Sequence, residues 1–335
     1  MTRKNEKIIA VPTNVITGFL GVGKTSTISH LLEQKPQHER WAILVNEFGE
    51  IGIDGSLFKI SAKKQNNLFI KEVPGGCMCC SSSLSMQIAL NKLLKEAKPH
   101  RLLIEPTGLG HPHEVLKLLS NQYYRDTLSL EKTITLVDAR HLSDKRYTEN
   151  ETFNQQLAIA DTIIVNKTDL YDAQDKTILS NYLTSNNFKH DLLHFTTHGK
   201  IDLAWLTGKT EYVSKNNKLL HHHKMIEEDI ADSPIPESGF IKAINQGEGY
   251  QSIGWRFNTE QVFDRIQLIT FLQSTKAIRL KAVFITTDGF FSYNNTSDGF
   301  HEKVIKECNE SRIEIICDNI NSQWEALLQQ TISTR

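Results

Sequence analysis

The stretch GFLGVGKT, Gly18 to Thr25, decides the fold class. It matches the pattern G-x4-G-K-[ST], follows the apolar run NVIT and precedes a helical pattern over residues 24–34. Glycines in such a loop let the backbone turn around an anion, and the following helix adds the positive end of its dipole. A glycine-rich turn without a ligand is the alternative, but the flanking patterns favour a phosphate-binding loop.

Each residue of this loop has an expected role. Lys24 should reach the β and γ phosphates of a nucleotide, and the Thr25 hydroxyl should bind Mg2+. The remaining residues should surround the phosphates with backbone N–H groups. The cofactor-binding residues predicted from this loop are Gly18, Gly21, Val22, Gly23, Lys24, Thr25 and Ser26.

A second motif predicts the base. Asn166, Lys167 and Asp169 follow the apolar run TIIV, and N-K-x-D after a strand, downstream of a phosphate loop, is typical of the guanine site of GTPases. The Asp carboxylate can accept hydrogen bonds from guanine N1–H and the 2-amino group, a pair that adenine lacks. The Asn amide can serve O6 or N7, and the Lys stem can pack on the ring. We therefore expect GTP and GDP rather than ATP.

The sequence RLLIEPTGLG, residues 101–110, supplies a third element. Glu105 ends an apolar run, and we expect it to act on Mg2+ directly or through water, while Gly108 offers its backbone N–H to the γ-phosphate. A carboxylate that only caps the loop is the alternative for Glu105. The predicted catalytic residues are Lys24, Thr25 and Glu105.

Three of the five cysteines lie in PGGCMCC, residues 74–80. Neighbouring cysteines cannot form a relaxed disulfide, and no second ligand pair follows at the spacing of a structural zinc module. Three thiolates with a carboxylate favour Zn2+, and Glu50 in NEFGEIGID lies where GTPases carry their first switch. Structural cysteines or a redox thiol pair remain alternatives. The predicted metal ligands are Glu50, Cys77, Cys79 and Cys80, with Co2+ or Ni2+ as other candidate ions.

The order of apolar runs predicts two domains. Short β-branched runs that alternate with helical patterns indicate an α/β P-loop NTPase domain with a mostly parallel sheet over residues 1–207. Residues 208–238 are polar and include two prolines and His221, His222 and His223, so we expect a linker with at most a weak metal-scavenging tract. Residues 239–335 predict a smaller α+β domain with a largely antiparallel sheet and helices over 259–274 and 321–332.

Composition limits the partners. The chain has 335 residues and a formal net charge of -1, so it shows no large electrostatic footprint for nucleic acid or an anionic membrane. We see no signal peptide and no apolar run of the length that spans a bilayer. Few cysteines, mostly clustered, fit a reducing compartment. These features predict a cytoplasmic protein without nucleic-acid or membrane partners.

Read together, GFLGVGKTS, NEFGEIGID, GGCMCC, EPTGLGHP and NKTDL resemble the CobW-like GTPases of metal homeostasis, relatives of the nickel-delivering GTPases of hydrogenase and urease maturation. The stretch SIGWRFNTEQVFDRI is similar to the C-terminal domain of that family. The resemblance implies a GTP-hydrolysing metal chaperone or insertase that binds zinc at its C-x-C-C motif and serves a client metalloprotein. The sequence departs from the family at GLGHPHE, which places His111 and His113 where imidazoles are not usual.

Two other classes of function are alternatives to a metal chaperone. A regulatory GTP-binding switch would act by docking a partner, and its cysteines would be structural. An ATP-dependent kinase or a zinc deaminase is disfavoured by the N-K-x-D motif and by the absence of H-x-E with P-C-x-x-C.

We find no obvious arginine finger, so we expect slow intrinsic hydrolysis that a client accelerates. A second copy of the chain is a further candidate partner.

Overall fold

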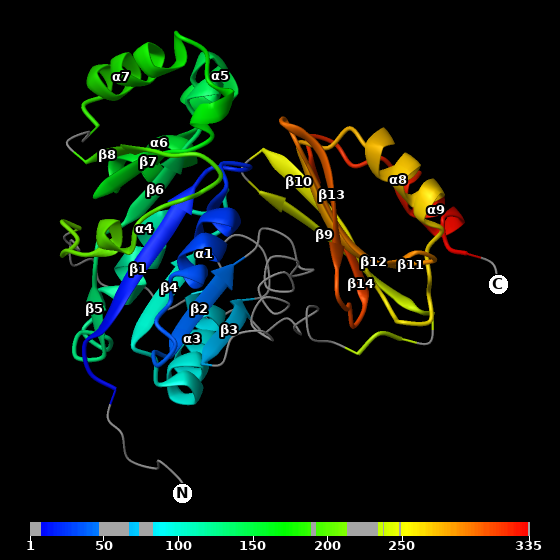
Figure 1. Ribbon diagram of the computed structural model, residues 1–335, viewed down its shortest axis with the longest axis horizontal. Coiled ribbons are helices and arrows are strands. Elements are labelled where there is room, and N and C mark those ends of the chain that lie inside the picture. The colour runs from blue at the N-terminus through cyan, green and yellow to red at the C-terminus, as the bar shows by residue number, and fades with distance from the viewer. Residues whose placement is uncertain are drawn as a thin grey trace, which may run out of the picture. The chain divides into compact units, whose positions relative to one another are not determined.

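The computed structural model describes residues 8–46, 67–73, 83–188, 192–212, 234–236, 238–247 and 249–333. These residues form two compact units, the first within residues 8–212 and the second within residues 234–333 (Figure 1). Residues 213–233 lie outside the described part, so the predicted limits of the domains and of the linker stay predictions. Among the described residues, no helix combines the length and apolar character needed to cross a membrane.

The first unit is built on a sheet with the strand order β3-β2-β4-β1-β6-β7-β8, in which β5 also pairs with β1. Every strand pair is parallel, which confirms the predicted P-loop NTPase class of α/β fold. The strand that precedes the phosphate loop is central, between β4 and β6. The strands are β1 Val11–Gly18, β2 Trp41–Asn46, β3 Leu68–Val73, β4 Arg101–Glu105, β5 Leu128–Leu130, β6 Ile134–Val137, β7 Thr162–Val165 and β8 Leu193–Phe195.

Helices connect these strands and cover the sheet. Helix α3 buries Met86, Leu90, Leu93 and Ala97 at a spacing of three or four residues, and this stripe packs in one core cluster with α4 and strands β1, β2 and β4. Each buried leucine contributes about 1.5–3 kcal/mol, so this face holds the sheet firmly. The helices are α1 Lys24–Glu33, α3 Ser83–Ala97, α4 Pro112–Leu119, α5 Lys145–Thr148, α6 Glu151–Ala158 and α7 Asp175–Ser185, with 3-10 turns at η1 Ala139–Ser143, η2 Thr168–Leu170 and η3 Leu203–Leu206.

The second unit is an antiparallel sheet with the order β13-β12-β11-β14-β10-β9. One apolar cluster joins alternate residues of these strands, among them Trp255, Phe284 and Ile315, to helices α8 and α9. This arrangement confirms the predicted α+β unit with a largely antiparallel sheet. The elements are β9 Phe240–Gly247, β10 Tyr250–Phe257, α8 Arg265–Ser274, β11 Arg279–Thr286, β12 Gly289–Thr296, β13 Gly299–Ile305, β14 Ser311–Cys317 and α9 Trp324–Gln330.

Two details of the second unit differ from the sequence-based expectation. The helix predicted over residues 259–274 begins only at Arg265, because the Asp264 side chain caps it by accepting a hydrogen bond from the Gln267 N–H. Phe263 instead forms isolated bridges with Thr286 and Ile332. The strand-like runs GFIKAIN, SIGWRFN, LKAVFIT and RIEIICD predict only four strands in this unit, so β12 and β13 were missed. Most residues of β13 are exposed, so this strand lacks an apolar alternation that the sequence could reveal.

Candidate functional site

The phosphate loop connects the end of β1 at Gly18 to the start of α1 at Lys24. Gly21 and Val22 lie within the loop, and Ser26 is exposed in the first turn of α1. Gly23 has a φ of 100°, and a Cβ atom there would lie 2.4 Å from Asn166 Nδ2. This position therefore requires glycine for its conformation and for the close approach of the Asn166 amide.

Lys24 and Thr25 bond to groups of the protein itself. The buried Lys24 ammonium donates hydrogen bonds from Nζ to the carbonyl oxygens of Gly18 (2.7 Å) and Phe19 (3.1 Å). Thr25 Oγ1 donates to Oε1 of the buried Glu105 at 3.2 Å, although 80 positions separate the two residues. The predicted phosphate lysine and the two predicted Mg2+ residues thus meet at the carboxyl edge of β1 and β4.

Gly108 lies beside the phosphate loop. A Cβ atom at this glycine would stand 2.8 Å from Leu20 Cδ2 and 3.1 Å from Lys24 Nζ, so a larger residue here would displace the Leu20 side chain and crowd the lysine. The structure therefore brings the predicted γ-phosphate contact next to the predicted phosphate lysine.

Asn166 links the base motif to the phosphate loop. Its buried side chain donates from Nδ2 to the Val22 carbonyl oxygen at 2.9 Å, and its Oδ1 accepts from the Gly199 N–H at 2.9 Å. The amide thereby joins the loops that follow β1, β7 and β8. A contact between this amide and guanine O6 or N7 stays a prediction, and it would compete with these two hydrogen bonds.

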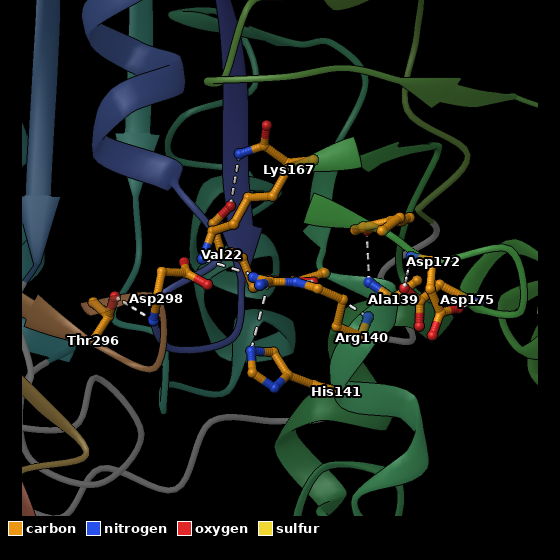
Figure 2. Close-up of polar contacts among 12 residues, drawn as sticks. Val22, Ala139, Arg140, His141, Lys167, Asp172, Asp175, Thr296 and Asp298 are labelled. Carbon is orange, nitrogen blue, oxygen red and sulfur yellow. Dashed lines mark hydrogen bonds and ion pairs between the residues drawn. The ribbon is translucent and has the colours of Figure 1, made fainter. Parts of the chain in front are cut away.

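Lys167 contacts a carboxylate that the sequence reasoning missed. Its Nζ lies 3.5 Å from Oδ2 of Asp138, which is buried directly after β6 (Figure 2). The same carboxylate accepts from Arg140 Nε at 2.9 Å and from Arg140 Nη2 at 2.5 Å, and the His141 ring lies 3.6 Å away. A carboxylate just after a buried strand was visible in the sequence, but the neighbouring position of β6 and β7 was not.

Tyr171 provides a second link between the loops after β6 and β7. Its hydroxyl accepts a hydrogen bond from the Ala139 N–H at 2.7 Å (Figure 2). Burial is the main cause that raises the pKa of Tyr171 above its usual range, so this phenol loses its proton only at a higher pH than an exposed tyrosine does. Asp169, the predicted guanine reader, is partly exposed on the 3-10 turn η2, and its Oδ2 lies 3.9 Å from His198 Nε2.

The predicted metal ligands Glu50, Cys77, Cys79 and Cys80 lie outside the described residues, as do His221, His222 and His223. Within the described ranges, no group of three or more His, Cys, Asp or Glu side chains could hold a metal ion. The described cysteines are the free thiols Cys308 and Cys317, and burial raises the pKa of Cys317 to about 11. His111 contacts Gln155, and the His113 ring packs against Tyr212.

The central β1 strand, the phosphate loop and the N-K-x-D loop at one sheet edge define a P-loop NTPase with a guanine-type base motif. The family model described as the CobW/HypB/UreG nucleotide-binding domain matches residues 12–193 of this sequence. The chain is 38% identical over 327 residues to the zinc chaperone YeiR of Escherichia coli K12, covering 96% of this chain and 98% of YeiR. The chain belongs to the CobW/HypB/UreG family, which confirms the resemblance found in its sequence.

Two further comparisons accompany these. The zinc chaperone CobW of Sinorhizobium sp is 30% identical over 264 residues, which cover 69% of this chain and 74% of that protein. The crystal structure of Zn(II)-bound YjiA GTPase from E. coli aligns with 97% of this chain and 99% of its own, with 18% identity and a TM-score of 0.42.

Proposed function

We propose that the protein is a GTP-hydrolysing metal chaperone that carries zinc to a client metalloprotein. The observation that carries the nucleotide part is the connection of Asn166 to Val22 and of Thr25 to Glu105, which ties a base motif and a Mg2+ pair to one phosphate loop. Family membership and the description of YeiR and CobW as zinc chaperones support the metal part.

The nucleotide would bind along the carboxyl edge of the sheet. Asp169 would read guanine, the Lys167 stem would pack on the ring, and Lys24 would turn from its loop carbonyls to the β and γ phosphates. A hydroxyl and a carboxylate are hard oxygen donors of the kind that Mg2+ prefers, so Thr25 and Glu105 fit this ion. Bound Mg2+ would neutralise charge on the phosphate oxygens. Hydrolysis would give GDP and phosphate, with a slow intrinsic rate.

The zinc cargo would bind Cys77, Cys79, Cys80 and Glu50, with Co2+ and Ni2+ as other candidate ions. We infer that the nucleotide state changes the affinity of this site, because Glu50 occupies the place of the first switch in GTPases, where loss of the third phosphate releases the segment. The alternative is a GTP-binding switch that docks a partner and has structural cysteines.

Zinc titration in both nucleotide states tests this proposal. We expect the purified protein to bind one tightly held Zn2+ with different affinities in GDP and in a non-hydrolysable GTP analogue, each with Mg2+. Cys79→Ala should abolish this zinc, whereas Cys308→Ala, which changes a thiol outside the cluster, should retain it. Equal zinc affinity in both states, or zinc retained by Cys79→Ala, would leave the docking switch as the better account. Competition with ATP tests the guanine preference.

A further inference from the structure

Two neighbouring glutamines of α6 hold the segment that joins β4 to α4. Gln156 Nε2 donates a hydrogen bond to the Gly108 carbonyl oxygen at 3.0 Å. Gln155 Oε1 lies 2.9 Å from His111 Nδ1, three positions further along the segment. This segment contains Gly108, whose N–H is the predicted contact of the γ-phosphate. Helix α6 therefore anchors both the glycine and the start of α4.

The chemistry of Gln156 points to a specific task. The side chain is buried, its Nε2 bonds Gly108, and its Oε1 has no hydrogen-bond partner among the described residues. An unsatisfied buried acceptor costs free energy, and a methionine of similar length would fill this space without that cost. The feature that an apolar side chain could not supply is the hydrogen bond to Gly108.

The peptide after Gly108 is held at both of its polar groups. Its C=O accepts from Gln156, and its N–H, which belongs to Leu109, donates to Thr107 Oγ1 at 3.1 Å. The N–H of Gly108 itself makes none of the hydrogen bonds found among the described residues. Gly108 also lies beside Lys24 Nζ, close to the predicted phosphate site. Its N–H is therefore available to a phosphate oxygen bound at that site.

The contact at His111 strengthens the same anchor. Gln155 Nε2 donates to Glu151 Oε1 at 2.9 Å, so the Gln155 oxygen faces His111. An amide oxygen only accepts, so the Nδ1 atom of His111 carries the proton in this contact. The imidazole that departs from the family pattern thus connects the N-cap of α4 to α6.

We propose that Gln156 is a positioning residue for the third phosphate. By holding the Gly108 carbonyl, it keeps the Gly108 N–H in place for the γ-phosphate and so contributes to the distinction between GTP and GDP. The proposal rests on the GTP binding proposed above. It assigns no contact between Gln156 and the nucleotide.

The test compares two affinities in one variant. Gln156→Met removes the donor and keeps the length of the side chain. We expect its affinity for a non-hydrolysable GTP analogue with Mg2+ to fall roughly fivefold, the worth of one net hydrogen bond, while its affinity for GDP stays within about twofold. Gln156→Leu, which also lacks the donor and is apolar, should show the same selective loss and decides the matter if the methionine variant does not fold.

The control is Asn154→Ala, on the same helix, because Asn154 Nδ2 bonds the Thr148 and Asn150 carbonyls and does not contact Gly108. This variant should keep the wild-type ratio of the two affinities. Parallel losses for GDP and the analogue in the Gln156 variants, or an unchanged ratio in folded protein, would overturn the positioning role. Failure of the wild-type protein to bind either guanine nucleotide would instead refute the proposed function.

Discussion

Replacing Asp138 by asparagine removes one negative charge from the contact between the loops after β6 and β7. The carboxylate accepts two hydrogen bonds from the Arg140 guanidinium and pairs with the Lys167 ammonium at 3.5 Å. Asparagine has nearly the same size, so the change acts on charge and hydrogen bonding rather than on packing. Two cations would then face a neutral amide.

The expected loss in the free energy of unfolding follows from the exposure of the two cations, Arg140 and Lys167. Breaking a fully buried ion pair costs about 3–5 kcal/mol, because the remaining charge stays unpaired. The side chains of Arg140 and Lys167 are 24% and 15% exposed, so both cations keep part of their hydration. We therefore expect the free energy of unfolding to fall by about 2 kcal/mol, in the range for hydrogen bonds to charged groups. Because the Lys167 ammonium loses its ion pair with Asp138, affinity for guanine nucleotide should fall about fivefold.

The chain contains a matched control six residues later. Asp144 accepts from Arg146 Nε and Nη2 and from the Arg146 backbone N–H, as Asp138 does with Arg140. The Asp144 and Arg146 side chains are 30% and 72% exposed, and surface pairs contribute only about 0–1 kcal/mol. Asp144→Asn should therefore change unfolding little and nucleotide affinity not at all.

Urea unfolding of the nucleotide-free protein and calorimetric titration with GDP and a GTP analogue measure these effects. The affinity of Asp138→Asn for GDP and its affinity for the GTP analogue should fall by the same factor, since both nucleotides carry guanine. If Asp138→Asn and Asp144→Asn unfold at the same urea concentration, or if GDP binds Asp138→Asn as tightly as wild type, the positioning of Lys167 by Asp138 is refuted.

Three more changes give separate tests. Gly23→Ala should displace the Asn166 amide, since the new Cβ would lie 2.4 Å from Nδ2, and titration should show at least a roughly tenfold loss of guanine nucleotide affinity. Tyr171→Phe leaves the Ala139 N–H without its acceptor and should cost about 1–2 kcal/mol in urea unfolding. Burial raises the pKa of Tyr124 to about 12, whereas an unfolded tyrosine titrates near pH 10. Above pH 10 the unfolded state loses this proton first, so stability should fall between pH 10 and 12, and less steeply in Tyr124→Phe.

Local signals in the sequence were sufficient for the phosphate loop and the sheet around it. The glycines and Lys24 form a contiguous motif, and the apolar runs before Gly18, Glu105 and Asn166 all proved to be strands. Parallel strands place their carboxyl ends at one edge of the sheet, which explains why these three motifs lie near one another. The Thr25–Glu105 hydrogen bond is one contact that this arrangement allows.

Long-range contacts of single polar side chains could not be predicted in the same way. The Asp138–Lys167 pair requires β6 to lie beside β7, and the Gln156–Gly108 bond requires α6 to reach the segment after β4. No periodicity along the chain encodes either approach. Gln156 in particular resembles any polar residue of a short helix until its burial is known.

The free energy of nucleotide binding depends on how Lys24 is held in the free protein. Its ammonium is already buried and already bonded to the carbonyl oxygens of Gly18 and Phe19. Phosphate oxygens would replace neutral acceptors by charged ones, which roughly doubles the strength of each hydrogen bond. The cost of desolvating the ammonium is therefore part of the folding free energy. Nucleotide binding gains only the difference in hydrogen-bond free energy between the phosphate oxygens and the two carbonyl oxygens. The two carbonyls that lose their donor set a limit on that gain, because each must find another partner or remain unsatisfied.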